Sequence, residues 1–160
     1  AIGKLAMGSL AAAVTGASNI AIGECAGKNV TSGTNNVVFG LKAGSCCAIT
    51  GSYNFIGGYS AGKCLTSASS NNFIGCKSAN NGIISGSYNN FYGAGTGQNL
   101  SSGHRNNAMG NGALYDLTQG LCNVAVGSQA GYKISTGSNN VVLGFAAGCR
   151  IDDHSIILAK

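Results

Sequence analysis

Large apolar side chains recur along the chain at a fixed distance from a repeating glycine. The glycines that mark the repeat are Gly3, Gly23, Gly40, Gly57, Gly75, Gly93, Gly110, Gly127 and Gly144, spaced by 17 or 18 residues after a first interval of 20. The two residues before each of them are apolar in every full copy. A fixed period of this kind is typical of stacked repeat proteins. We therefore predict a single repeat array over residues 1–160, with about nine copies.

Each copy is predicted to contain two short strands joined by two turns. A second glycine precedes most marker glycines by seven residues, and a second apolar column lies just before it: Val14, Val30, Ile49, Leu65, Ile84, Leu100, Leu117 and Ile134. The apolar spacing lacks the 3.6-residue period of a helix. The fold class predicted is all-β, a β-solenoid or parallel β-roll, with coils about 4.8 Å apart. Nine such coils make a rod of roughly 40 Å.

The two residues before each marker glycine are expected to face opposite sides of their strand, because side chains alternate along a strand. The residue directly before the glycine is large throughout, so we expect it to point into the core. The residue before that is then expected on the outer side, where its apolar character predicts a contact between chains. That candidate inter-chain column contains Val38, Phe55, Phe73, Phe91 and Val142. The alternative is that the column packs inside a wider coil of one chain.

An asparagine stands four residues before most marker glycines. The column is Asn19, Asn36, Asn71, Asn89, Asn106, Asn123 and Asn140, and it is interrupted where Tyr53 precedes Asn54. Asparagine tolerates the left-handed conformation of a corner. Its amide can donate to the same group one coil away while accepting from the coil on the other side. The column is therefore predicted to be a structural ladder between coils.

Composition disfavours several classes of function but does not identify a particular function. The chain has 27 glycines, no proline, 8% charged residues and a formal charge of +5 that comes from scattered lysines and arginines. Disorder is disfavoured because the apolar residues keep register with the glycines. The sequence has no basic cluster of the kind that would predict nucleic-acid binding. It also has no apolar run long enough to predict membrane insertion. The four acids and two histidines gather only at Asp152, Asp153 and His154, expected to form a surface turn, so we predict no enzyme, cofactor or metal site.

Seven cysteines are a disulfide signal in a secreted chain. Cys47 and Cys64 fall in the same column of neighbouring coils, so their Cα atoms are expected about 4.8 Å apart, inside the disulfide range. They are predicted to bond if the protein is extracellular. Four further cysteines occupy scattered columns and are expected to be fillers: Cys25, Cys76, Cys122 and Cys149.

The copies at residues 18–27, 35–44 and 137–148 share the pattern of an asparagine, an apolar triplet and glycine, followed by Ala-Gly. They resemble the head repeats of trimeric autotransporter adhesins and the related repeats of phage and large-virus tail or surface fibres. The resemblance covers nearly the whole chain. It implies an extracellular structural or adhesive rod on a virion or cell surface, a fragment of a longer homotrimeric fibre. A host-surface glycan or receptor is the implied partner.

A different function is predicted by a column of small hydroxyl residues beside the second glycine. It contains Thr15, Ser32, Thr50, Ser67, Ser85, Ser102 and Thr136, with Gln119 interrupting it. Regular hydroxyls on a flat solenoid face are typical of ice-binding proteins. A single column is weaker support than paired threonine rows, so ice binding stays the alternative.

Overall fold

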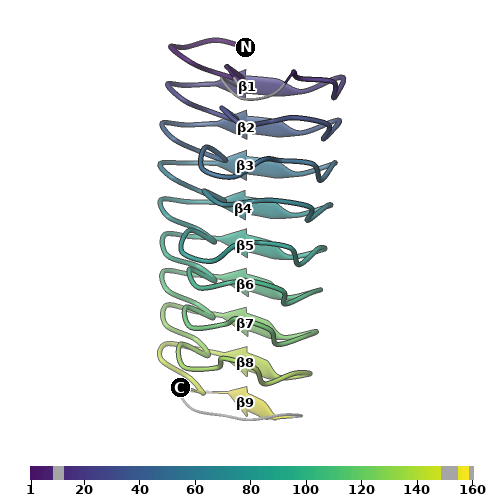
Figure 1. The fold of residues 1–160 in the computed structure, drawn as a ribbon. Helices are drawn as coiled ribbons and strands as arrows, with labels where there is room; N and C mark the ends of the chain where they lie inside the picture. Colours follow the sequence, from purple (N-terminus) through teal and green to yellow (C-terminus); the bar gives the residue numbers. More distant parts are fainter. Residues whose placement is uncertain (9–12, 149–154, 159–160) are drawn as a thin grey trace.

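The structure, a computed structural model, describes residues 1–8, 13–148 and 155–158 and shows a β-solenoid with one short strand in each coil (Figure 1). The strands are β1 (Ile20–Ile22), β2 (Val37–Phe39), β3 (Phe55–Gly57), β4 (Asn72–Ile74), β5 (Asn90–Tyr92), β6 (Asn107–Met109), β7 (Val124–Val126), β8 (Val141–Leu143) and β9 (Ile156–Leu158). They form one parallel sheet in chain order. Within the described ranges, no helix is long and apolar enough to cross a membrane.

The strand register shows that the marker glycine of one coil is Gly58, one residue later than the sequence pattern predicts. Phe39 pairs with Gly57, and Gly57 pairs with Ile74, so Gly57 occupies a strand position. The corner position of that coil belongs to Gly58, whose φ of +121° matches the +117° of Gly40. The assignment of Gly57 to the corner column was therefore wrong. With Gly58 as the marker, Asn54 enters the asparagine column, which then has no interruption.

The middle residue of each strand points into the core, which reverses the predicted faces. Eight middle residues are at most 2% exposed: Ala21, Val38, Ile56, Phe73, Phe91, Ala108, Ala125 and Val142. Of the five residues in the proposed inter-chain column, Val38, Phe73, Phe91 and Val142 are thus core residues, and only Phe55, at 36% exposed, is on the outer side. Of the residues expected inside, Ile56 is buried, and the others, such as Phe39 and Met109, are on the outer side instead. Sequence periodicity cannot tell the two faces apart when both are apolar.

The opposite wall of the core is lined by the second apolar column, as predicted for all of its members except Val14, which is 39% exposed. Val30, Ile49, Leu65, Ile84, Leu100, Leu117 and Ile134 are at most 1% exposed. Their backbones do not form the predicted second strand; in the described part of the chain they pair only at the isolated bridges Val30↔Ile49 and Leu65↔Ile84. Coil length differs at this wall: Ile49 is five residues after Gly44, whereas Val30 is three after Gly27.

The corners after β1 to β7 require glycine for two reasons. At Gly110 the backbone φ is +132°, a conformation that residues with a side chain rarely adopt. A Cβ atom there would lie 2.4 Å from the carbonyl oxygen of Gly127, one coil away. Left-handed residues follow two and four positions later, as at Gln129 and Gly131 after Gly127. This alternation turns the chain sharply and brings each coil onto the last.

Candidate functional site

The outer side of the sheet is an apolar surface that the described residues leave uncovered. The first residues of the strands are Ile20, Val37, Phe55, Asn72, Asn90, Asn107, Val124, Val141 and Ile156; the third residues are Ile22, Phe39, Gly57, Ile74, Tyr92, Met109, Val126, Leu143 and Leu158. We call these two columns the outer face. None of its residues is charged. Met109 is 55% exposed and Ile20 51% exposed, although both are apolar.

Side chains on the outer face are already ordered by contacts between coils. The Phe39 ring lies over Gly57, where a Cβ atom would be 2.2 Å from the ring, and packs edge-on against Phe55 with ring centroids 5.4 Å apart. Asn72 Nδ2 donates to Asn90 Oδ1 at 2.6 Å, and Asn90 Nδ2 donates to Asn107 Oδ1 at 2.8 Å. The polar centre of the face thus satisfies much of its hydrogen bonding within the chain.

The asparagine column forms a continuous buried ladder. Asn106 Nδ2 donates to Asn89 Oδ1 at 3.0 Å and to the carbonyl oxygen of Gly120 at 2.8 Å, while Asn106 Oδ1 accepts from the backbone and side chain of Asn123. The same pattern recurs from Asn36 to Asn140 through members that are at most 1% exposed. The left-handed residue is the one before each ladder asparagine, such as Arg105 at φ +58°, and not the asparagine itself.

The hydroxyl column of the ice-binding alternative lies on the surface. Thr15, Ser32, Thr50, Ser67, Ser85, Gln119 and Thr136 are exposed, and Ser102 is half-buried. A second row beside it turns its hydroxyls to the next coil, as when Thr118 Oγ1 donates to the Ser135 carbonyl oxygen at 3.0 Å. Coils with the longer corner have no residue for this second row, because Ile49 and Ile84 are followed directly by Thr50 and Ser85. The two rows are therefore not continuous.

A groove of about 300 Å³ lies beside the corners that follow β4, β5, β6 and β7. The rings of Tyr115 and Tyr132 stack at its edge with centroids 4.7 Å apart. Its lining also includes Lys77, Gln98, Asn111 and Gln129, beside small residues such as Ala94 and Gly95. The groove therefore combines aromatic rings with amide groups.

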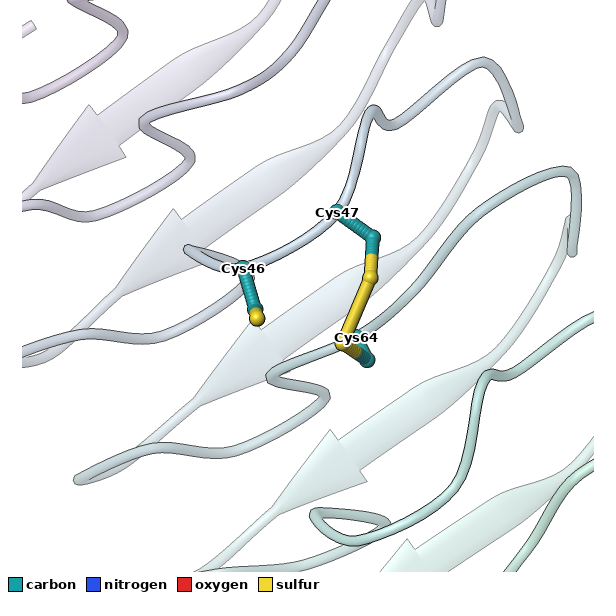
Figure 2. A group of neighbouring side chains, drawn as sticks. All are labelled: Cys46, Cys47 and Cys64. Carbon is teal, nitrogen blue, oxygen red and sulfur yellow. A yellow bond between two sulfur atoms is a disulfide. The ribbon is translucent and has the colours of Figure 1, made fainter.

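Three cysteines gather at one corner (Figure 2). A disulfide joins Cys47 to Cys64 on the next coil, with Cα atoms 4.8 Å apart, as expected from their shared column. Cys46, which the sequence interpretation overlooked, is exposed, and its sulfur lies within 4.8 Å of the other two. The signal that could have found it is the Cys-Cys pair inside the corner that is longer than its neighbours. Of the scattered cysteines, Cys25 is half-buried, Cys76 and Cys122 are exposed, and Cys149 lies outside the described residues.

The acids and histidines of the described ranges are on separate coils. Asp116 pairs with Lys133, with Nζ 2.8 Å from Oδ2, and accepts from Asn99 Nδ2. Glu24 is exposed. His104 Nδ1 accepts from the backbone N–H of Ser87 at 3.0 Å, the role that the Ser87 hydroxyl itself performs for the N–H of Ser69. The cluster of Asp152, Asp153 and His154 lies outside the described residues.

Comparison of the chain with protein-family models, with curated proteins and with solved structures gives no match.

Proposed function

We propose that the chain is a structural and adhesive segment of an extracellular homotrimeric fibre, on a virion or cell surface, in which the outer faces of three rods meet. The observation that carries this proposal is the uncovered apolar side of the parallel sheet. Parallel sheets occur almost only with both faces covered. Here the core covers one face, and an array of exposed Ile, Val, Phe, Met and Leu side chains forms the other.

The shape of the outer face favours association along the rod. Each strand contributes two outward side chains about 7 Å apart, so the face is a narrow stripe about 40 Å long. A narrow stripe suits a central axis shared by several rods better than a broad two-sheet sandwich. Three rods, as in the adhesins and fibres that the sequence resembles, each turn one stripe toward that axis.

The polar residues of the stripe do not oppose burial strongly. The side chains of Asn72, Asn90 and Asn107 donate and accept hydrogen bonds along one row. Fewer of their polar atoms are therefore left without a hydrogen-bond partner when association removes water from the stripe. Burial of an unpaired polar group costs far more than burial of a paired one. Because the stripe also contains no charged residue, its association is driven by apolar burial.

The test is sedimentation equilibrium of the chain and of the variant Met109→Glu. We expect three times the 15.8 kDa chain mass for the natural sequence and a single-chain mass for the variant, because a carboxylate on the axis would be buried unpaired. The exposed Thr136→Glu, on the opposite wall, is the matched control and should stay trimeric. A single-chain mass for the natural sequence at every concentration contradicts the proposal.

Two further features support the adhesive and extracellular parts. The groove beside Tyr115 and Tyr132 offers aromatic surface and amide groups, the combination that a glycan on a host surface would use. The Cys47–Cys64 disulfide is of a kind that persists in oxidising, extracellular surroundings. Binding to an immobilised glycan panel that is lost in Tyr132→Ala and retained in Tyr53→Ala, with the trimer intact in both, would support this role. Equal binding by both variants would contradict it.

Ice binding is the second candidate, and the exposed hydroxyl column favours it. The column spans the described rod from Thr15 to Thr136, but Gln119 interrupts it. Thermal hysteresis of the purified protein, lost in Thr50→Lys, would support this function in place of the fibre role. If the protein solution freezes at the same temperature as a solution of a control protein, the result would contradict ice binding.

A further inference from the structure

The corner that carries Cys46, Cys47 and Cys64 has three sulfur atoms, and a single disulfide uses only two of them. All three sulfur atoms lie within 4.8 Å of one another. Figure 2 shows the Cys46 side chain pointing along the stack toward the coil of Cys64, in the same direction as the Cys47 side chain. The disulfide occupies two of these sulfurs and leaves the third beside it as a thiol.

We propose that the reduced form of this corner is a three-thiolate site for a thiophilic divalent ion of the Zn²⁺ class. Thiolates bind Zn²⁺ at about 2.3 Å, which places tetrahedral ligand sulfurs about 3.8 Å apart. The Cys46 sulfur therefore needs to approach each of the other two by about 1 Å or less. The Cys47 and Cys64 sulfurs, no longer bonded in the reduced form, move apart to the same ligand spacing. Three protein ligands leave the fourth position to water, as in other open zinc sites.

The backbone on both sides holds the corner in place for this role. The N–H of Cys46 donates to the Lys63 carbonyl oxygen at 2.8 Å, across the gap between the coils. From the coil on the other side, Asn29 Nδ2 donates to the carbonyl oxygens of Ser45 and Cys46, both at 3.1 Å. The side chains are free to adjust while the peptide that carries them is fixed.

Access to the site needs no opening of the fold. Cys46 is exposed, and Cys47 and Cys64 are half-buried at the surface. An ion can therefore reach all three sulfurs from solvent. The corner also belongs to the longer turn between Gly44 and Ile49, and these added residues place two adjacent cysteines opposite one.

The disulfide and the ion compete for the same atoms. A dithiol reductant breaks the Cys47–Cys64 bond, leaves two thiols on the chain and is itself oxidised to its cyclic disulfide. Binding then exchanges the thiol protons for the ion and releases one proton for each sulfur that was protonated. A chain that folds in a reducing compartment holds this three-thiol form before the disulfide closes.

The test is a Zn²⁺ titration of the reduced, desalted protein under anaerobic conditions, in competition with a chromophoric chelator. We expect one tight equivalent for the natural sequence, and affinity at least about tenfold lower for Cys46→Ser, which loses one of three thiolate ligands. Cys76→Ser, which removes an exposed thiol outside the corner, should bind as the natural sequence does. The oxidised protein should lack the tight equivalent.

Substituting Co²⁺ for Zn²⁺ adds a direct readout, because sulfur-to-cobalt charge-transfer absorption reports thiolate ligation and should weaken in Cys46→Ser. A non-reducing peptide map of oxidised Cys46→Ser that still contains the Cys47–Cys64 disulfide shows that the variant is folded. Equal Zn²⁺ affinity of Cys46→Ser and the natural sequence, equal loss in Cys76→Ser, or no tight equivalent at all would overturn the proposal.

Discussion

Asn89 Oδ1 accepts two hydrogen bonds from Asn106 on the next coil, one from its backbone N–H at 3.1 Å and one from its side-chain Nδ2 at 3.0 Å. Both residues are fully buried. Each internal asparagine of the ladder therefore connects its coil to both neighbours, and its removal leaves buried partners on each side.

Asn106→Ala is expected to lower the free energy of unfolding by about 3 kcal/mol or more, because each buried polar group left unpaired costs about 1–3 kcal/mol. The groups left without a partner are the Gly120 carbonyl oxygen and the N–H of Asn123, and Asn89 Oδ1 keeps only the backbone N–H of residue 106. Denaturant unfolding measures the change. Asn111→Ala is the matched control, since this asparagine is exposed and lies outside the outer face, and it should lose less than about 1 kcal/mol. Equal losses in the two variants would contradict the ladder.

Gly110→Ala is expected to destabilise the rod by about 3 kcal/mol, because the added Cβ meets the Gly127 carbonyl oxygen and φ is +132°. Gly95→Ala should cost about 1 kcal/mol. Its column already holds Lys77 and Gln129 in the same left-handed conformation, and the nearest atom to its Cβ is the end of the flexible Gln98 side chain. Thermal unfolding compares the two. A Gly110→Ala protein as stable as Gly95→Ala would show that the corner tolerates a side chain.

Cys64→Ser removes the cross-link between two coils and is expected to lower the free energy of unfolding by about 3 kcal/mol, from the chain entropy that a loop of this size regains when unfolded. The loop spans 17 residues. Cys76→Ser, an exposed thiol, should change stability by less than about 0.5 kcal/mol. Unfolding is measured without reductant. If added dithiol destabilises Cys64→Ser as much as the natural sequence, the disulfide is not the source of the difference.

The repeat could be predicted from the sequence because its constraints are local. A glycine that combines positive φ with a clash one coil away must recur wherever a coil turns, as at Gly110 and Gly127. Two consecutive glycines, Gly57 and Gly58, both fit the pattern at this corner, so the sequence alone does not identify the corner residue. Only the register against Phe39 and Ile74 decides between them.

The direction of the side chains could not be predicted in the same way. In Val37-Val38-Phe39 every residue is apolar, so alternation predicts two faces without identifying the inner one. Residue size suggested that Phe39 is buried, but Val38 is the core residue. Size does not identify the inner face, because the same core column holds Val38 in one coil and Phe73 in another. The Cys46 thiol was missed for a related reason. Residues added in a longer corner have no equivalent position in the other copies of the repeat, so the repeat pattern does not place them.

The central claim, that rods meet through the outer face, is tested most directly by photo-crosslinking. A benzophenone side chain placed at Met109 is predicted to crosslink to the outer face of another chain, identified by mass spectrometry. The same probe at Thr136, exposed on the opposite wall, is predicted to give no inter-chain product. No inter-chain product from position 109, or equal products from both positions, would contradict the account.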